Sequence, residues 1–360
     1  MSERMDVSVV ISTYNGAACL PDALDSVLNQ DADDLPYEVI VVDNNSRDAT
    51  RAVIQSFVAR GFNQLQYVFE PRQGVSYGRN AGIAVARAPI IAFFDDDVRV
   101  ARDWVRTIKR TMDEHAEVDF VGGKVLPTWH APPPAWLTEA NWTPLALVDY
   151  GPTPFYVTAE RQLCLVSANL AVRRSLFDAV GLFAPELQRV KDSIGSMEDH
   201  ELLTRCWCAG KQGMYLPTLL AKTNVPASRM TKEYHRRWHR GYGVFCATMR
   251  IIEDSDRNGC YIGKNSGREL LTLFGVPAFL FRQIADELPK WLLASVRRQP
   301  ALAFKHENNV RFLVSYSRAR YREERVRSDR SVVAEVGSVA GKLLRKKVRT
   351  ALRGGQKRSA

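Results

Sequence analysis

Short apolar runs punctuate the first hundred residues at regular intervals. The runs at 7–12, 38–42, 65–69 and 90–94 are rich in β-branched residues and carry few polar positions. Continuous apolar runs of this length, bounded by turn residues, are typical of strands buried on both faces. We therefore predict four buried strands in this part of the chain.

The segments between these runs have apolar residues at the spacing of one helix face. The first segment presents Leu20, Ala23, Leu24, Val27 and Leu28. In the second segment, Ser46 or Asp48 is placed to cap a helix and Gly61 to end it. A Gly-containing loop and a short helix at Asn80–Ala86 are predicted to follow.

The alternation of strands and helices predicts an α/β fold with a mainly parallel sheet covered by helices. In such sheets ligands bind beyond the carboxyl ends of the strands. Asp43 ends the second predicted strand, and Asp95–Asp97 follow the fourth. We therefore expect these carboxylates to meet at one edge of the sheet.

The later part of the chain changes character near residue 226. Strand-like segments are expected at 120–126, 163–169 and 171–173, and a helix at 201–209 ended by Gly210. Beyond Pro226, basic and aromatic residues mix with helical patterning. We expect a catalytic α/β domain over 1–226 and a mostly helical, basic region over 227–360.

The acidic triplet Asp95–Asp97 is the first candidate for chemistry. Adjacent carboxylates repel one another, so a cation or hydrogen-bond donors should compensate them. Two such side chains, with diphosphate oxygens and waters, can hold Mg2+ or Mn2+, which would neutralise the charge on a leaving diphosphate. The alternative interpretation is a solvated turn.

Two loops add groups that suit a nucleotide. The loop Ser12–Gly16 offers the face of Tyr14 for base stacking, and Asp43 offers a carboxylate to a base N–H or a ribose hydroxyl. The segment Gln73–Gly82 places Arg79 near a helix start, which suits phosphate. Its glycine spacing matches neither a dinucleotide fingerprint nor a Walker loop.

A third acidic pair, Glu198-Asp199, precedes the predicted helix at 201–209. Carboxylates at a helix start are favoured by the helix dipole, so capping is one interpretation. The other is a general base that takes the proton of an acceptor hydroxyl.

Taken together, these segments resemble glycosyltransferase family 2, whose members have the GT-A fold. The resemblance covers residues 7–231 and rests on five segments in order: Val9–Asn15, Val41–Ser46, Gly74–Gly82, Phe94–Asp97 and Glu198–Arg205. It implies an inverting transfer of a sugar from a nucleotide-sugar donor to an acceptor hydroxyl, with Mg2+ or Mn2+ as cofactor. The acceptor would be a saccharide, a lipid-linked glycan or another hydroxyl compound of polysaccharide or glycoconjugate synthesis.

The resemblance also implies roles for single residues. Asp199 would be the catalytic base, and Asp97 would hold the metal. The donor would contact Thr13, Tyr14, Asn15, Asp43, Arg79, Asp95 and Asp96. Glu198 would support the base.

One position departs from the family pattern. A His that often contacts the metal or diphosphate in related sequences is replaced here by Thr223. His235 or His239 is a candidate substitute, and Arg236, Arg237 and Arg240 are candidates to face the diphosphate. Trp129, Trp136 and Trp142 would either stack on a sugar or anchor a loop.

Charge and hydropathy bear on location. The net charge is +10, and the segment from Lys342 to Arg358 has eight basic and no acidic residues. Apolar positions between Val332 and Val348 alternate with basic ones at helical spacing. We therefore expect a basic amphipathic helix that lies on an anionic bilayer. The alternative is that the helices pack on the catalytic domain and the tail is solvated. The start of the chain suggests no signal peptide, and no run of about eighteen apolar residues predicts a membrane span. We expect a cytoplasmic protein, peripheral on the inner face of the cytoplasmic membrane.

Two other functions share parts of this pattern. A sugar nucleotidyltransferase would need a basic, Gly-rich loop directly after the first strand, and Thr13–Gly16 carries no basic residue. A non-catalytic nucleotide-binding α/β module would not require both Asp97 and Asp199. No nucleic-acid reader motif is present, so nucleic acid is not expected as a partner. The six scattered cysteines predict free thiols.

Overall fold

The first four strands of the protein are parallel neighbours, as the sequence predicted. The structure, a computed structural model, describes residues 5–187, 197–251, 253–255 and 270–327. The elements of the first part are β1 (Val7–Thr13), α1 (Leu20–Leu28), β2 (Tyr37–Asp43), α2 (Thr50–Ala59), β3 (Leu65–Phe69), α3 (Val75–Val85) and β4 (Ile90–Phe93). The strands lie in the order β3-β2-β1-β4, and β1, β2 and β4 are buried almost throughout.

The second part of the chain extends this sheet to nine strands. Its elements are β5 (Val98–Val100), α4 (Trp104–Glu114), β6 (Phe120–Trp129), β7 (Phe155–Val157), β8 (Leu170–Arg173), α5 (Ser175–Val180), α6 (Glu198–Cys208) and β9 (Gly213–Val225). Strand β8 pairs antiparallel with both β4 and β6, so it joins the parallel half to the rest. The full order is β3-β2-β1-β4-β8-β6-β9-β5, with β7 on β9.

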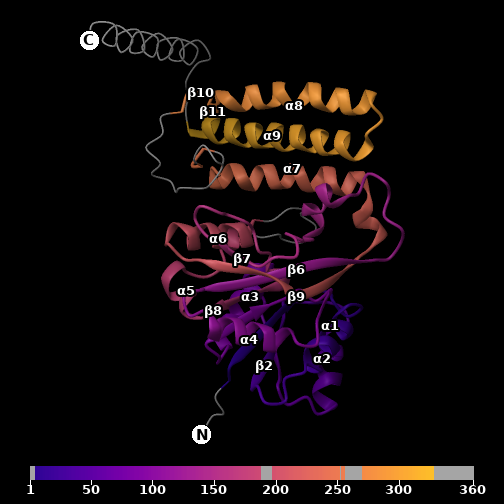
Figure 1. Cartoon of the computed structure of the whole chain (residues 1–360), viewed down its shortest axis with the longest axis vertical. Coiled ribbons are helices and arrows are strands. Elements are labelled where there is room, and N and C mark those ends of the chain that lie inside the picture. The colour runs from indigo at the N-terminus through magenta and orange to yellow at the C-terminus, as the bar shows by residue number, and fades with distance from the viewer. Residues whose placement is uncertain (1–4, 188–196, 252, 256–269, 328–360) are drawn as a thin grey trace, which may run out of the picture.

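The sheet is followed by a stack of three long helices. These are α7 (Lys232–Met249), α8 (Ala278–Val296) and α9 (Pro300–Arg327), with the two-residue strands β10 (Thr272–Leu273) and β11 (Val276–Pro277) before α8. Figure 1 shows α7 nearest the sheet, α9 in the middle and α8 outermost. Gly243 allows the close approach of α7 and α9, because a Cβ there would lie 2.6 Å from the carbonyl oxygen of Phe312.

The packing of α3 on β1 sets the position of the candidate site. A Cβ at Gly78 would lie 2.0 Å from Oγ of Ser12, at the carboxyl end of β1. Only glycine allows this contact without displacement. The next residue, Arg79, is thereby held beneath the strand ends, where Thr13 of β1 lies opposite Asp43 of β2.

Several element boundaries differ from the prediction. Helix α3 begins at Val75 instead of Asn80, because the N–H of Gly74 donates to Oδ1 of Asn44 and Gly74 takes the positive φ of 143° that starts the helix. Helix α6 begins at Glu198, so the acidic pair forms its first turn.

The remaining differences lie in the second half of the chain. The segment 163–169, which was expected to be strand-like, is irregular and ends in a 3-10 turn at Ser167–Asn169. The amphipathic segment Val332–Val348 lies outside the described residues.

Candidate active site

A cavity of about 870 Å3 opens where the carboxyl ends of the strands meet α7. It is lined by residues from several separate segments between the end of β1 and α7. They include Thr13 and Tyr14, Asp95–Asp97, Trp142–Tyr150, Glu198–His200 and Arg229. The structure therefore brings Asp97 and Asp199, which are 102 positions apart in sequence, into one cavity.

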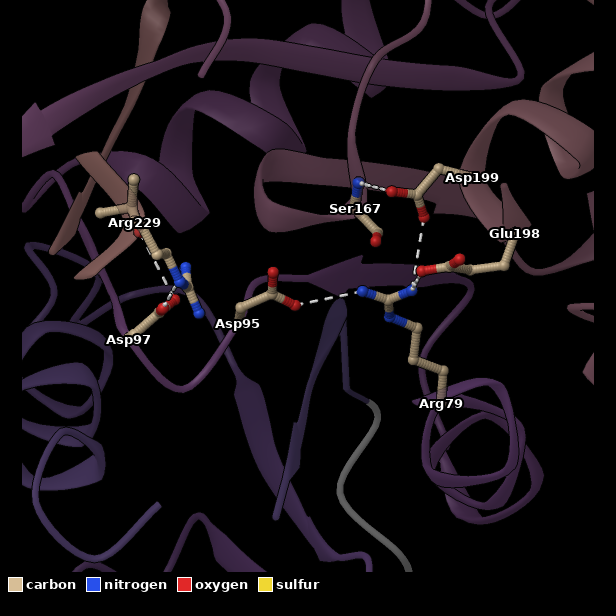
Figure 2. Close-up of polar contacts among 8 residues, drawn as sticks. Arg79, Asp95, Asp97, Ser167, Glu198, Asp199 and Arg229 are labelled. Carbon is tan, nitrogen blue, oxygen red and sulfur yellow. Dashed lines mark hydrogen bonds and ion pairs between the residues drawn. The ribbon is translucent and has the colours of Figure 1, made fainter. Parts of the chain in front are cut away.

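Arg79 is the centre of the polar network in this cavity. Its Nη2 lies 3.1 Å from Oδ1 of Asp95, and its Nη1 lies 3.1 Å from Oε1 of Glu198 and 3.3 Å from Oδ1 of Asp199 (Figure 2). The side chain is 5% exposed. Burial alone would lower the pKa of Arg79, but the charges of Asp199, Asp95 and Glu198 raise it above its usual value.

This network orients Asp199. One oxygen of Asp199 faces Arg79, and the other accepts a hydrogen bond of 3.2 Å from the N–H of Ser167 (Figure 2). Two contacts on separate oxygens fix the plane of the carboxylate. The Asp199 side chain is 20% exposed, against 6% for Glu198, so Asp199 is the more accessible of the pair.

A second cation faces the acidic triplet from the far side. Nη1 of Arg229, in the 3-10 turn Ala227–Met230, lies 3.3 Å from Oδ2 of Asp97. The hydroxyl of Thr223 donates to Oδ1 of Asp97 over 3.4 Å. Asp96 accepts a 2.5 Å hydrogen bond from the hydroxyl of Thr13. The repulsion expected within the triplet is thus compensated by different partners for each carboxylate.

The nucleotide side of the cavity differs from the prediction at two positions. Tyr14 is 41% exposed and lines the cavity together with Thr13. Asp43 and Asn15 are not among the lining residues. The Asp43 carboxylate accepts from the N–H of Ser46 and the hydroxyl of Tyr67. Oδ1 of Asn15 accepts from the N–H of Arg47. The contact of Asp43 with a base stays a prediction.

Asn44 and Gln73 line the cavity near these loops. The side-chain amide of Asn44 donates to the carbonyl of Arg72 and accepts from the N–H of Gly74, so it ties β2 to the start of α3. Within the described part of the chain, the buried Nε2 of Gln73 has no hydrogen-bond partner. A buried donor without a partner is costly, and a ligand oxygen would satisfy it.

Helix α7 forms the opposite wall of the cavity, which the motifs did not indicate. Tyr234, Arg237, Trp238 and Tyr242 lie on one face of α7 and line the cavity. Tyr234 also donates to the carbonyl of Pro144, which joins α7 to the loop that carries Trp142. Trp142 lines the cavity as well, whereas Trp129 and Trp136 do not.

The other basic residues proposed on α7 do not reach the cavity. Arg236 instead forms an ion pair of 2.7 Å with Glu307 of α9, and Arg240 pairs with Glu233. His235 is fully buried against the rings of Trp136 and Phe304, and burial lowers the pKa of both His235 and His239 to about 4. Neither histidine lines the cavity, so neither takes the place of the histidine that Thr223 replaces.

The residues missed from the sequence are Arg229, Ser167 and the aromatic face of α7. Ser167 acts through its backbone N–H, which any residue type would provide. Arg229 lies in the segment Pro226–Met230, which has no distinctive spacing. The aromatic residues of α7 lie in the stretch beyond Pro226 where basic and aromatic residues mix, a pattern that predicts a helix but not the cavity that it lines.

Comparison with known proteins agrees with this geometry. Residues 8–181 match the family model described as Glycosyl transferase family 2. Glycosyltransferase AglE of Haloferax volcanii is 30% identical over 182 residues, 50% of this chain and 57% of the relative. Putative glycosyltransferase EpsH of Bacillus subtilis is 24% identical over 261 residues, 71% of each protein. The chain thus spans little more than half the length of AglE.

Two solved structures share the fold. Mannosyltransferase PcManGT from Pyrobaculum calidifontis, in complex with GDP-Man and Mn2+, superposes with a TM-score of 0.56 and 17% identity, covering 88% of this chain and 86% of that one. S. aureus TarS 1–349 with UDP-GlcNAc gives a TM-score of 0.51 at 17% identity, covering 91% and 93%.

The sheet order, the flanking helices and these superpositions define a GT-A glycosyltransferase fold followed by a helical C-terminal region. The sequence match points to a particular family. Residues 8–181, just under half of the chain, match the glycosyltransferase family 2 model.

Proposed function

We propose that this chain is an inverting glycosyltransferase that uses Mg2+ or Mn2+ and moves a sugar from a nucleoside-diphosphate sugar to an acceptor hydroxyl. The observation that carries the proposal is the shared cavity of Asp95, Asp97 and Asp199, with Asp199 oriented by Arg79 and by the N–H of Ser167. A base on one side and acidic metal ligands on the other are what a single displacement requires.

The residues around the acidic triplet suit a hard divalent ion. Carboxylate oxygens are the ligands that Mg2+ and Mn2+ prefer, and Asp95, whose side chain is 39% exposed, and Asp97 both face the cavity. The described residues contain no group of three His, Cys, Asp or Glu side chains that could hold a metal by themselves. The remaining ligands would therefore come from the donor diphosphate and water. When bound, the ion would supply positive charge to the leaving diphosphate.

In this proposal Asp199 accepts the proton of the acceptor hydroxyl as its oxygen attacks the anomeric carbon. The bond from that carbon to the diphosphate oxygen breaks on the opposite face, so the configuration inverts. Arg79 and Ser167 hold the carboxylate in place, and Tyr14 and Gln73 offer contacts to the nucleotide. Trp142, Trp238 and Tyr242 offer flat faces on the acceptor side, which suit a saccharide ring.

The names of the relatives favour a glycoconjugate acceptor. One related protein, from Haloferax volcanii, is named Glucosyl-dolichyl phosphate glucuronosyltransferase and is 28% identical to this chain over 179 residues. Another, of Bacillus subtilis, is named Minor teichoic acid biosynthesis protein GgaB. We propose an acceptor of this kind, either a saccharide or a lipid-linked glycan.

The test combines donor binding with loss of the base. Thermal unfolding is followed with UDP-, GDP- and dTDP-sugars, with and without Mn2+, and the stabilising donor is then used for hydrolysis or transfer. Asp199→Asn should lower turnover about 100- to 1,000-fold, since general bases contribute by that order, while donor binding persists. Asp178→Asn, at an exposed position of α5, is the matched control.

Three results would contradict the proposal. Undiminished hydrolysis in Asp199→Asn would remove the base assignment. Release of pyrophosphate from a nucleoside triphosphate would favour a sugar nucleotidyltransferase instead, and a nucleotide bound without turnover would favour a binding module.

We also propose that the protein binds the cytoplasmic membrane surface through α8. No helix among the described residues combines the length and hydropathy needed to cross a bilayer. The helix α8 is the outermost of the stack (Figure 1). It nevertheless exposes Phe281, Leu288, Leu292 and Val296 at the spacing of one helix face, with exposed fractions of 46%, 40%, 65% and 77%. Arg297 and Arg298, exposed at the end of α8, follow this stripe and suit an anionic lipid surface, whereas Arg282 pairs with Asp286 and Lys290 with Glu287.

A vesicle-binding experiment tests whether a membrane, and not another copy of the protein, covers this stripe. The wild-type protein should sediment with phosphatidylglycerol vesicles, and Leu292→Ser with Val296→Ser should abolish sedimentation. Leu182→Ser, at a residue that is 46% exposed on the catalytic domain, is the control. Binding that survives the double substitution, or a stripe that instead mediates self-association in light scattering, would refute the proposal.

A further inference from the structure

Few positive charges reach the cavity where a diphosphate would lie. The lining residues in the described part of the chain include three arginines, Arg79, Arg229 and Arg237, and no lysine. Arg79 is already surrounded by three carboxylates. His200 also lines the cavity, but burial lowers its pKa to about 4, so it is neutral near pH 7. Arg229 and Arg237 are therefore the cations available to a ligand.

Arg229 differs from Arg237 in what it contacts. Its guanidinium lies 3.3 Å from Oδ2 of Asp97, the carboxylate expected to hold the metal, and its side chain is 31% exposed. Burial opposes the charge of Arg229, whereas Asp97, Asp95 and Asp96 raise its pKa, so it stays protonated. Arg237 is exposed and lines the cavity from α7, and no ion pair joins it to a carboxylate among the described residues.

We propose that Arg229 is an exchangeable counter-ion: it neutralises Asp97 when the donor is absent, and it moves to the diphosphate when a divalent ion takes Asp97. The inference rests on the proposed function and adds a positioning residue to it. Two cations bound to one carboxylate repel each other, so the ion and Arg229 compete for Asp97. The diphosphate offers Arg229 a bidentate partner in exchange.

Competition and exchange predict effects of opposite sign. Without Arg229, Asp97 has lost a competing cation, so a divalent ion should bind the protein more tightly. The diphosphate has lost a charge-assisted contact, so a nucleoside diphosphate should bind more weakly. A residue that only supports the fold would weaken both.

The experiment measures two affinities on the full-length protein by calorimetry. The probes are Mn2+ alone, and UDP, GDP or dTDP in the presence of saturating Mn2+. Arg229→Gln should lower the Kd for Mn2+ about tenfold and raise the Kd for the nucleotide about tenfold, as expected for one charge-assisted contact. Arg229→Lys keeps the charge and should leave Mn2+ affinity within about twofold of the wild type.

Two further variants separate the exchange from a general loss of positive charge. Arg237→Gln should weaken the binding of UDP or GDP and leave the Mn2+ affinity within about twofold of the wild type, since screening reduces the influence of the Arg237 charge on Asp97. Arg240→Gln, which lies on α7 away from the cavity, should change neither. Circular dichroism melts confirm that each variant is folded.

The outcomes are distinct. Tighter Mn2+ binding together with weaker nucleotide binding in Arg229→Gln supports the exchange. Unchanged or weaker Mn2+ binding in folded Arg229→Gln overturns it while leaving the proposed function in place. If the wild type binds none of Mn2+, UDP, GDP and dTDP, both the exchange and the proposed function are wrong.

Discussion

Replacing Arg79 by methionine tests the network on which the site depends. Methionine fills much of the same volume but leaves the carboxylates of Asp95, Glu198 and Asp199 without their shared cation. We therefore expect a loss of stability together with a loss of turnover, although Arg79 contacts neither donor nor acceptor in the proposed reaction.

The size of the effect follows from the distances and the burial. At an effective dielectric constant of about 20, one ion pair about 4 Å apart is worth ~4 kcal/mol, and three such pairs are offset by the cost of burying the guanidinium. Removal of one partner from a buried ion pair costs about 3–5 kcal/mol in general. We expect a change in the free energy of unfolding of this size, and a fall in Tm of about 5–10 °C.

The assay is urea unfolding followed by circular dichroism, with turnover of the stabilising donor measured in parallel. Arg102→Met is the matched control, because Arg102 pairs with Asp31 at the surface with exposed fractions of 77% and 55%. Such a pair contributes about 0–1 kcal/mol. Glu198→Gln, introduced together with Arg79→Met, should restore part of the loss by removing one unpaired charge.

A clear result would refute the reasoning. If Arg79→Met unfolds within about 1 kcal/mol of the wild type, the three carboxylates do not depend on Arg79 for compensation. If the variant also retains full turnover, the orientation of Asp199 does not depend on it either. Either result would require a different account of how the acidic groups share the cavity.

Three further predictions concern other parts of the molecule. Gly78→Val should reduce stability by about 1–3 kcal/mol in urea unfolding, because its Cβ would meet Ser12, and unchanged stability would show that α3 can move away from β1. Burial alone would raise the pKa of Glu287, but hydrogen bonds from Lys290, His306 and Asn309 lower it to about 2. The ionised Glu287 contributes about 1–2 kcal/mol to the free energy of unfolding above the unfolded pKa near 4.5, and this contribution is lost as the pH falls toward about 2. Glu287→Gln should therefore make the free energy of unfolding depend less on pH across that range. An unchanged pH dependence of unfolding would contradict this. Gly243→Leu should lower Tm, because its side chain would push α7 away from α9. Gly61→Leu is the control: no atom lies within 4 Å of a Cβ at Gly61, so this substitution tests backbone strain without a steric clash.

The sequence by itself determined the α/β alternation, the four parallel strands and the acidic residues at their ends. These follow from local patterns: buried strands require continuous apolar runs, and parallel strands place their carboxyl ends at one edge. The motifs also identified Asp95, Asp97 and Asp199 as members of one site. The match over residues 8–181 supports the family that those motifs indicated.

Only the tertiary structure decided how the charges are paired. Arg79 looked like a phosphate ligand from its place near a helix start, yet the fold surrounds it with carboxylates from the loop after β4 and from α6. Asp43 ends its strand as predicted, but its carboxylate accepts hydrogen bonds from Ser46 and from Tyr67 of β3, and it is not part of the cavity lining. Arg229 and the aromatic face of α7 have no local signal, because their role depends on contacts with residues more than eighty positions away. Local patterns determine which elements form, whereas the partner of each charge depends on long-range packing that no short segment encodes.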